Sequence, residues 1–386
     1  MLVERMRPFT STIFTEISRL AVETGAINLG QGFPDTDGPA SLLADAAANI
    51  TERGVNQYPP GPGMPSLRRA VADHQRRFYG LEVDPADVVV TTGATEAIAS
   101  ALLGLCEPGD EVVTFEPAYD SYAASVALAG ATLKPVPLHP PRFGFDDDEL
   151  AAAFSDRTKV VLVNTPHNPT GTVFTRAQLV RIGELAVAHD AVIVTDEVYE
   201  HMTFDDAEHV PMATLPGLAG RTLTISSAGK TFSVTGWKVG WIHGPPELVA
   251  APRAVKQFLT FHGGAPLQPA VANALALGDD FYFSITTDLT RKRDLLSAGL
   301  RAAGFDVLTP RGTYFVVADP RPLGFDDGVD LAGKLPGLCG VAAVPVSVFC
   351  SSAAGVAATR PLVRFAFCKR DEVLTEAAER LAGLRG

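Results

Sequence analysis

Short apolar runs rich in β-branched residues recur between residues 87 and 226, and Ala- and Leu-rich stretches separate them. The runs are DVVVTTG (87–93), EVVTFE (111–116), KVVLVN (159–164), AVIVTD (191–196) and TLTIS (222–226). Near-continuous apolar strands with helices between them indicate a mostly parallel sheet that is buried on both faces. The sequence therefore predicts an α/β fold with helices on both sides of one large sheet.

The character of the sequence changes after about residue 285. A charged helical stretch, TRKRDLLSAGLRAAG, is followed by TYFVVAD, VAAVPVS and LVRFAF and then by a final helical stretch. This pattern predicts a smaller α+β unit that the N-terminal segment completes. We expect a large domain over residues 41–284 and a small domain made of residues 1–40 and 285–386.

The composition excludes some classes of partner. The 386-residue chain is 46% hydrophobic, which is enough to fill sizeable cores. Its formal net charge is −12, from 44 acidic against 32 basic residues. Because no basic run is present that would neutralise a series of phosphates, we expect no nucleic-acid partner.

A cytoplasmic location without a membrane partner is expected. Residues 335–359 carry no charge, but prolines and glycines interrupt them, whereas a membrane-spanning helix needs about 20 mainly apolar residues. We expect a strand near 340–344 and a loop there. The N-terminal segment lacks the apolar core of a signal peptide. No paired spacing joins the four cysteines, Cys106, Cys339, Cys350 and Cys368.

Candidate site residues follow several of the predicted strands, because ligands of such sheets gather at the carboxyl ends of the strands. Gly93, Ala94 and Thr95 open an Ala-rich helix, where free N–H groups favour an anion. Asp196 ends a buried strand and needs a partner, such as a protonated ligand nitrogen. Alternatively, Asp196 caps the next element.

Other candidates lie in a proline-rich loop and in an apolar strand. Asn168 stands between two prolines in NTPHNPTG, which would fix the direction of its amide unless it only forms a turn. His167 beside it has no metal-ligand spacing and is expected to be structural. Arg364, inside LVRFAF, needs an anion, either an internal acid or a substrate carboxylate. Tyr58 and Tyr119 either stack on a ligand or pack in loops and cores.

Two lysines, Lys230 and Lys238, lie in SSAGKTFSVTGWKVGW, a stretch without acidic residues. An ammonium group among small and apolar neighbours is poorly hydrated, which favours the neutral amine. The same stretch contains Ser227 and Lys230 as an S-x-x-K motif of acyl-transfer hydrolases, but the companion S-D-N and K-T-G elements are missing.

Taken together, these segments resemble the class I/II aminotransferases, which are fold type I pyridoxal-phosphate enzymes. The resemblance covers nearly the whole chain, and it is strongest to the N-succinyldiaminopimelate aminotransferases and to the kynurenine/glutamine transaminase branch. It implies a large domain with a seven-stranded sheet and pyridoxal 5'-phosphate as the cofactor. The motifs that carry it are GQGFPD, NQYPPGPG, TTGATEA, EPAYDSY, NTPHNPTG, TDEVYEH, SSAGKTFSVTGWKVGW and RFAFCKRDE.

The resemblance implies a role for each residue around the cofactor ring. Lys230 would form the Schiff base with the cofactor aldehyde and later carry a proton. Asp196 would pair with the pyridine nitrogen. Asn168 and Tyr199 would contact the phenolic oxygen of the ring, and Tyr119 would stack on its face.

The resemblance also assigns the phosphate and the substrate. Ser227, Lys238 and the backbone of Gly93–Thr95 would hold the phosphate, although the family often has Arg where Lys238 stands. Arg364 would bind the substrate α-carboxylate, and Gly32 would line the substrate pocket. Tyr58 would reach the phosphate of a neighbouring subunit, which implies a homodimer with shared sites.

The implied reaction moves an amino group from an amino-acid donor to a 2-oxo acid such as 2-oxoglutarate. N-succinyl-LL-2,6-diaminopimelate, a substrate of lysine biosynthesis, predicts a second basic group in the pocket, for which Arg253 and Lys256 are candidates. A kynurenine/glutamine/methionine aminotransferase is the alternative, and kynurenine or methionine predicts an apolar pocket. Elimination from cysteine conjugates and a non-catalytic sensor are further alternatives.

Overall fold

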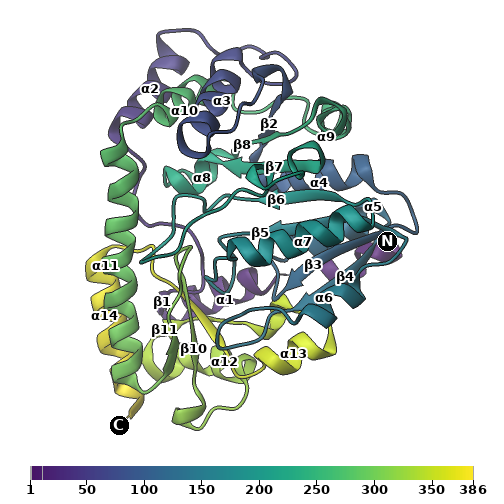
Figure 1. Ribbon diagram of the computed structural model, residues 1–386. Coiled ribbons are helices and arrows are strands. Elements are labelled where there is room, and N and C mark those ends of the chain that lie inside the picture. Colours follow the sequence, from purple (N-terminus) through teal and green to yellow (C-terminus); the bar gives the residue numbers. More distant parts are fainter. Residues whose placement is uncertain (1, 11, 386) are drawn as a thin grey trace.

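A seven-stranded sheet forms the centre of the structure (Figure 1). The structure is a computed structural model, which describes residues 2–10 and 12–385. The strands lie in the order β2-β8-β7-β6-β5-β3-β4, and β8 alone runs antiparallel to its neighbours. Their bounds are β2 (Val88–Thr92), β3 (Glu111–Glu116), β4 (Thr132–Pro137), β5 (Thr158–Asn164), β6 (Val192–Asp196), β7 (Thr222–Ser227) and β8 (Val239–His243).

The α/β fold with a mostly parallel sheet is confirmed, and all five apolar runs form strands of this sheet. The two strands that no run indicated have weaker patterns. β4 is a partly exposed edge strand that contains two prolines, which an edge strand tolerates. β8 is a buried five-residue strand that follows the polar turn of Lys238.

Alternate residues of the strands pack against helices on opposite faces of the sheet, which is the period of two that β-structure imposes. Val112 and Val160 belong to the same core as α4, α5 and α9, whereas Val113 and Val161 belong to the core of α6 and α7. A third core joins the β2–β8 edge to α2, α3 and α10. The bounds are α2 (Ala40–Thr51), α3 (Pro65–Tyr79), α4 (Gly93–Leu105), α5 (Ser121–Ala129), α6 (Asp147–Ala153), α7 (Arg176–Ala188), α9 (Pro246–Leu259) and α10 (Leu267–Leu275).

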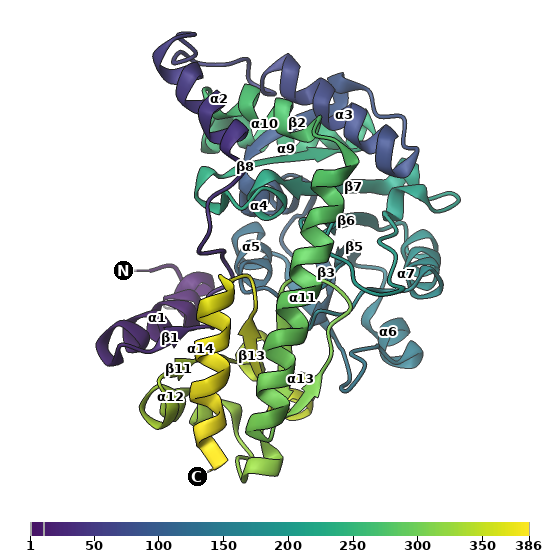
Figure 2. The same cartoon turned by 90° about the vertical axis from the view of Figure 1, so that its left-hand side faces the viewer.

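A smaller unit carries an antiparallel sheet in the order β12-β13-β10-β9 and a parallel pair, β1-β11. Its long helices α11 and α14 lie side by side (Figure 2). The strands are β1 (Ile27–Asn28), β9 (Asp306–Leu308), β10 (Phe315–Asp319), β11 (Val341–Ala342), β12 (Val344–Pro345) and β13 (Val363–Ala366). The helices are α1 (Ile13–Thr24), α11 (Asp279–Ala303), α12 (Gly328–Cys339), α13 (Ala353–Thr359) and α14 (Asp371–Ala382).

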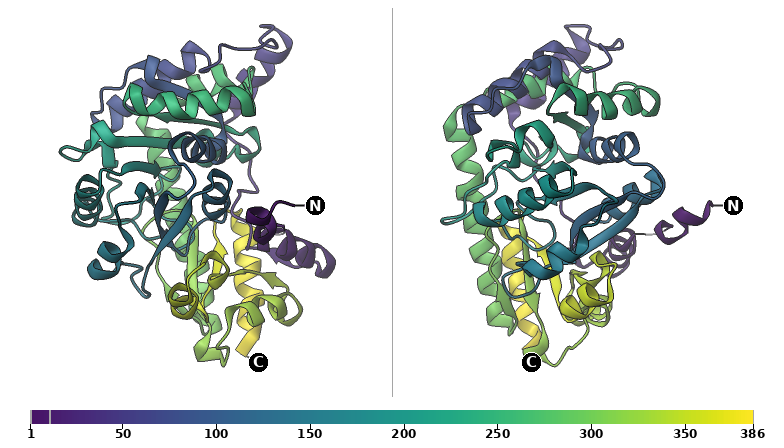
Figure 3. Two further views of the ribbon diagram at one scale, coloured as in Figure 1. Left: turned by 90° about the vertical axis from the view of Figure 1, so that its right-hand side faces the viewer. Right: turned by 45° about the vertical axis from the view of Figure 1, so that its right-hand side comes forward.

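The N-terminal segment packs with the C-terminal unit. β1 pairs with β11, and α1 contacts α12. In Figure 3 the purple N-terminal segment lies beside the yellow-green C-terminal part of the chain. α11 runs without a break through the boundary expected between residues 284 and 285. The exact domain boundaries therefore stay a prediction.

The expectation of one strand and a loop within residues 335–359 is only partly right. α12 extends to Cys339, and β11 and β12 follow it. The expected loop also holds the helix α13, because Ser352 caps its start by accepting a hydrogen bond from the backbone N–H of Gly355. In the part of the chain that the structure describes, no helix is long and apolar enough to cross a membrane.

Short helices complete the described chain. Among them, α8 follows β7 directly and carries Lys230. Their bounds are α8 (Ala228–Thr231), η1 (Glu4–Phe9), η2 (Pro85–Asp87), η3 (Met212–Thr214), η4 (Ala219–Arg221), η5 (Thr235–Trp237), η6 (Arg321–Leu323), η7 (Ser347–Phe349) and η8 (Gly383–Arg385), where η denotes a 3-10 helix.

Candidate active site

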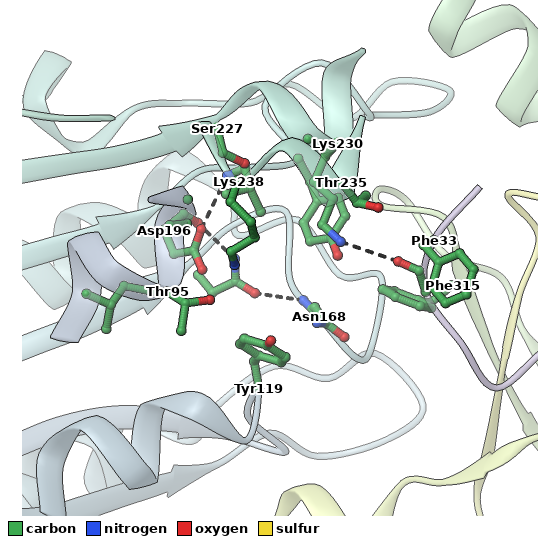
Figure 4. Close-up of a pocket in the computed structure, with 18 of the residues that line it drawn as sticks. Phe33, Thr95, Tyr119, Asn168, Asp196, Ser227, Lys230, Thr235, Lys238 and Phe315 are labelled. Carbon is green, nitrogen blue, oxygen red and sulfur yellow. Dashed lines mark hydrogen bonds between the residues drawn. The ribbon is translucent and has the colours of Figure 1, made fainter. Parts of the chain in front are cut away.

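A cavity of about 340 Å³ lies where the carboxyl ends of β2, β5, β6 and β7 meet the smaller unit (Figure 4). Every residue to which the family resemblance assigned a role lines it, except Tyr58. These residues are Gly32, Gly93, Ala94, Thr95, Tyr119, Asn168, Asp196, Tyr199, Ser227, Lys230, Lys238 and Arg364. The fold therefore brings together residues that are up to 332 positions apart, from Gly32 to Arg364.

Lys230 reaches the cavity from α8 and pairs with no carboxylate of the described residues. Its Nζ donates hydrogen bonds to Tyr314 Oη at 2.9 Å and to the backbone oxygen of Gly32 at 3.3 Å. Burial of the amine lowers the pKa of Lys230 to about 8. The amine is therefore neutral in part of the molecules near neutral pH.

Asp196 is buried at the end of β6 and has no cationic partner among the described residues. The hydroxyl of Tyr122 donates to its Oδ2 at 2.6 Å, and the backbone N–H of Val198 donates to Oδ1 at 3.4 Å. Burial raises the pKa of Asp196 to about 6, although the Tyr122 bond opposes that rise. The long Val198 contact makes helix capping a minor part of what this carboxylate does.

Arg364 lies in β13 and is 1% exposed. Its guanidinium donates to Asn168 Oδ1 at 2.8 Å and to the backbone oxygen of Gly30 at 2.9 Å, while Nε has no partner. No acidic residue of the described chain forms an ion pair with it. Burial lowers the pKa of Arg364 to about 10, so the group stays charged at neutral pH. Its charge is therefore available to an anion that binds in the cavity.

Aromatic rings surround this guanidinium. Its central carbon lies 4.0 Å from the ring centre of Phe315, 5.0 Å from that of Phe349 and 5.5 Å from that of Phe14. Ring faces attract a cation without neutralising it. They therefore keep Arg364 in place and leave its charge for a ligand.

Lys238 and the start of α4 form an anion cradle. A Cβ built on Gly93 would lie 3.1 Å from Lys238 Nζ, so the ammonium sits directly beside the first turn of the helix. Gly93 has a φ of +73° and Lys238 a φ of +54°, so both bend sharply. A helix N-terminus together with an ammonium group suits a phosphate.

The structure adds site residues that sequence reasoning missed. Tyr122 bonds to Asp196, Tyr314 bonds to Lys230, and Phe14 and Phe315 line the cavity. Tyr122 stands three residues after Tyr119 in the EPAYDSY motif, which is the one available signal. Tyr314, Phe14 and Phe315 carry no such signal, because the sequence shows them only as aromatic residues near the strands of the smaller unit and near the N-terminus.

Three other residues that the sequence analysis considered lie outside the cavity. His167 is buried and bonds to Thr170, which agrees with a structural role. Lys256 donates to the backbone oxygens of Phe261 and Gly61, and neither Lys256 nor Arg253 lines the cavity. The expectation that these two groups meet the substrate within one chain is therefore not supported by the geometry.

Tyr58 lies outside the cavity and is 83% exposed. Its ring centre is 5.6 Å from that of Phe261 and 5.1 Å from that of His262. Phe258 and Leu259 at the end of α9 are exposed as well. Tyr58 is thus placed on an apolar surface and not in its own chain's site.

The described residues also contain one close group of metal-ligating side chains, His74, Glu200 and His201. The two imidazoles bond to each other through their Nε2 atoms at 2.8 Å. Both oxygens of Glu200 accept hydrogen bonds, from Tyr79 and Ser226. The members of this group therefore satisfy one another and their neighbours without an ion.

The sequence of the chain matches known proteins over its full length. The family model of the class I and II aminotransferases matches residues 24–381. A probable N-succinyldiaminopimelate aminotransferase of Mycobacterium tuberculosis is 53% identical, over 100% of this chain and 98% of that protein. The methionine aminotransferase of Escherichia coli K12 is 40% identical, over 97% of this chain and 96% of that protein.

The fold matches as well. The solved structure of N-succinyldiaminopimelate aminotransferase from Mycobacterium tuberculosis has a TM-score of 0.97 at 52% identity, with both chains covered completely.

The anion cradle generates a first prediction, for the variant Gly240→Ala. A Cβ at Gly240 would lie 2.6 Å from the backbone carbon of Gly93, so β8 and the start of α4 must separate. We expect the free energy of unfolding to fall by about 1–3 kcal/mol in denaturant titrations. Calorimetric titration of the cofactor-free protein with inorganic phosphate should show weaker binding.

Gly236→Ala is the matched control, because nothing lies within 4 Å of a Cβ at Gly236. Wild-type phosphate affinity in Gly240→Ala would contradict the geometry of the cradle.

Proposed function

This chain belongs to the class I and II aminotransferases, and we propose that it transfers the amino group of N-succinyl-LL-2,6-diaminopimelate to 2-oxoglutarate. That it is a pyridoxal-phosphate-dependent transaminase follows from the family match and the full-length relatives. The proposed substrate is that of the relative with 53% identity over the whole chain, and this identity is the observation that carries it.

The cavity fits pyridoxal 5'-phosphate at three places. Asp196 is a buried carboxylate without a cation, Lys230 is an amine without a carboxylate, and Lys238 lies at the start of α4. These groups match a ring nitrogen, an aldehyde and a phosphate, respectively. When bound, the cofactor supplies an aldehyde that takes the amino group and a ring that withdraws electrons from the α-carbon.

Residues of the chain hold the reacting parts in this proposal. Lys238, Ser227 and the backbone of Gly93–Thr95 bind the phosphate. The Asp196 carboxylate accepts a hydrogen bond from the ring nitrogen and keeps the proton on it. Tyr119 covers the ring face.

Tyr199 and Asn168 donate hydrogen bonds to the phenolic oxygen of the ring. Burial raises the pKa of Tyr199 far above its ordinary value, so its hydroxyl keeps the proton that it donates.

Lys230 acts as the base. Near pH 8, part of its amine is neutral, and Nζ then takes the proton from the α-carbon of the donor. Arg364 binds the α-carboxylate and presents the α-carbon to Nζ, with its unpaired Nε as one of the donors. Gly32 lines the substrate side through its backbone.

We also propose a homodimer in which Tyr58 serves the partner subunit's site. The support is the exposed apolar surface of Tyr58, Phe258, Leu259 and Phe261, since apolar side chains gathered on one surface favour burial by a partner. A cytoplasmic location stays a prediction.

The cavity itself favours a second candidate substrate, methionine. Among the residues that line it, the cations are Lys230, Lys238 and Arg364, and each already has a proposed task. Phe14, Phe33 and Phe315 form an apolar wall instead. The two further carboxylates of the succinylated donor must therefore meet partner-subunit groups or backbone N–H groups, whereas methionine needs only the apolar wall.

A panel of amino donors tests the proposed substrate. We expect kcat/KM for N-succinyl-LL-2,6-diaminopimelate, with glutamate release measured from 2-oxoglutarate, to exceed that for methionine, glutamine and kynurenine by about 100-fold or more, since a bound extra carboxylate contributes several kcal/mol. A preference for methionine would replace the first candidate by the second.

The bond from Tyr122 to Asp196 predicts a pH effect for Tyr122→Phe. A carboxyl group with a raised pKa is charged above that pKa, so cofactor binding should be lost as the pH falls through about 6. The hydrogen bond from Tyr122 favours the charged form of Asp196. Its removal should raise the pH at which half of the cofactor binding is lost by about one unit. Fluorescence titration of the cofactor-free protein measures this midpoint.

Tyr79→Phe serves as the control, because Tyr79 donates to a carboxylate outside the cavity, that of Glu200. An unchanged midpoint in Tyr122→Phe would show that Tyr122 does not set the charge of Asp196.

A further inference from the structure

The hydroxyl of Tyr314 links three parts of the chain beside Lys230. Tyr314 precedes β10 in the smaller unit and is 1% exposed. Its Oη lies 2.5 Å from the backbone oxygen of Gly32 in the N-terminal segment and 2.9 Å from Lys230 Nζ on α8. The contacts join residues 282 and 84 positions apart in sequence.

The chemistry of the groups fixes the direction of both bonds. A backbone carbonyl only accepts, so the single proton of Tyr314 goes to Gly32. Burial raises the pKa of Tyr314 well above its ordinary value, so that proton stays. The Tyr314 oxygen can then only accept a hydrogen bond from Lys230.

This arrangement orients the amine of Lys230. A neutral amine has two hydrogens and one lone pair. Its hydrogens have acceptors at Tyr314 Oη, 2.9 Å away, and at the Gly32 oxygen, 3.3 Å away. The lone pair of Nζ therefore faces away from both oxygens. Neither the Tyr314 hydroxyl nor the Gly32 carbonyl donates a hydrogen bond to it.

Packing holds the hydroxyl in place. The Tyr314 ring packs edge-on against the Tyr199 ring, with 5.3 Å between the ring centres, and against the Phe315 ring, with 4.9 Å between the ring centres. Gly32 cannot carry a side chain there, because a Cβ would lie 2.4 Å from the Phe315 ring. The carbonyl of Gly32 and the Tyr314 hydroxyl thus form a rigid pair of acceptors.

We propose that Tyr314 is a positioning residue that holds the amine of Lys230 whenever that amine is not bound to the cofactor. It stabilises the ammonium form by accepting from it, and it aims the lone pair of the neutral form at the substrate side. The proposal rests on the role of Lys230 given above. It deepens that role and does not depend on which amino donor is used.

Tyr314→Phe tests the proposal, because it keeps the ring and removes only the hydroxyl. The holoenzyme is reconstituted with pyridoxamine 5'-phosphate, in which Lys230 is free, and is labelled briefly with acetic anhydride across a range of pH. Peptide mass spectrometry then gives the rate at Lys230, which follows the neutral amine. The wild-type midpoint is expected near 8.

In Tyr314→Phe, the ammonium loses an acceptor while the burial remains, so the midpoint should fall by about one pH unit. With the best amino donor of the wild type, kcat should fall by about tenfold or more, because the base is no longer oriented. KM should change by less than about twofold, because Tyr314 does not hold the substrate carboxylate.

Tyr282→Phe is the matched control. It removes another buried tyrosine hydroxyl that donates to a backbone oxygen, that of Leu275 at 3.0 Å, outside the cavity. The control should lose similar thermal stability and keep the wild-type labelling midpoint and kcat.

An unchanged Lys230 midpoint with wild-type kcat in Tyr314→Phe would overturn the proposal and leave Tyr314 as packing only. An equal loss of kcat in both variants would also overturn it. The labelling needs no amino donor, so a wrong substrate assignment leaves this test intact, whereas failure of the donor panel alone would leave the role of Tyr314 standing.

Discussion

The structure depends on ionisable groups that face one cavity without counter-ions of their own. Asp196 and Arg364 are buried, Lys230 lines the same cavity, and no described residue forms an ion pair with any of the three. Burying an unpaired charge costs several kcal/mol, so a chain keeps such groups only where something else supplies the opposite charge. A cofactor and an α-amino acid together supply a ring nitrogen, an aldehyde and a carboxylate.

Neutral partners hold these groups without satisfying their charges. Tyr122 donates to Asp196, Tyr314 accepts from Lys230, and the oxygens of Asn168 and Gly30 accept from Arg364. Each partner fixes a direction but leaves the charge available to the ligand. The smaller unit takes part in three of these four contacts, through Tyr314, Arg364 and Gly30. This couples the packing of β10 and β13 to the chemistry at the end of the large sheet.

Much of this was predictable from the sequence, because the strands that carry the site are continuous apolar runs. Asp196 follows directly from a strand end, and the family motifs named Ser227 and the other predicted site residues, but not Tyr122, Phe14 or Phe315. β4 and β8 lacked such runs, and the helix α13, with seven residues, is too short to show a helical period. The contacts of Tyr314 could not be predicted from the sequence, because its partners Lys230 and Gly32 are 84 and 282 positions away and only the fold brings them together.

The central claim is that Lys230 is the residue that links to the cofactor and moves the proton. Borohydride reduction of the holoenzyme followed by peptide mapping tests it most directly. The account predicts a pyridoxyl group on Lys230 alone, and a folded Lys230→Ala variant that carries no such group and turns over no amino donor. A pyridoxyl group on another lysine, or full turnover by Lys230→Ala, would contradict it.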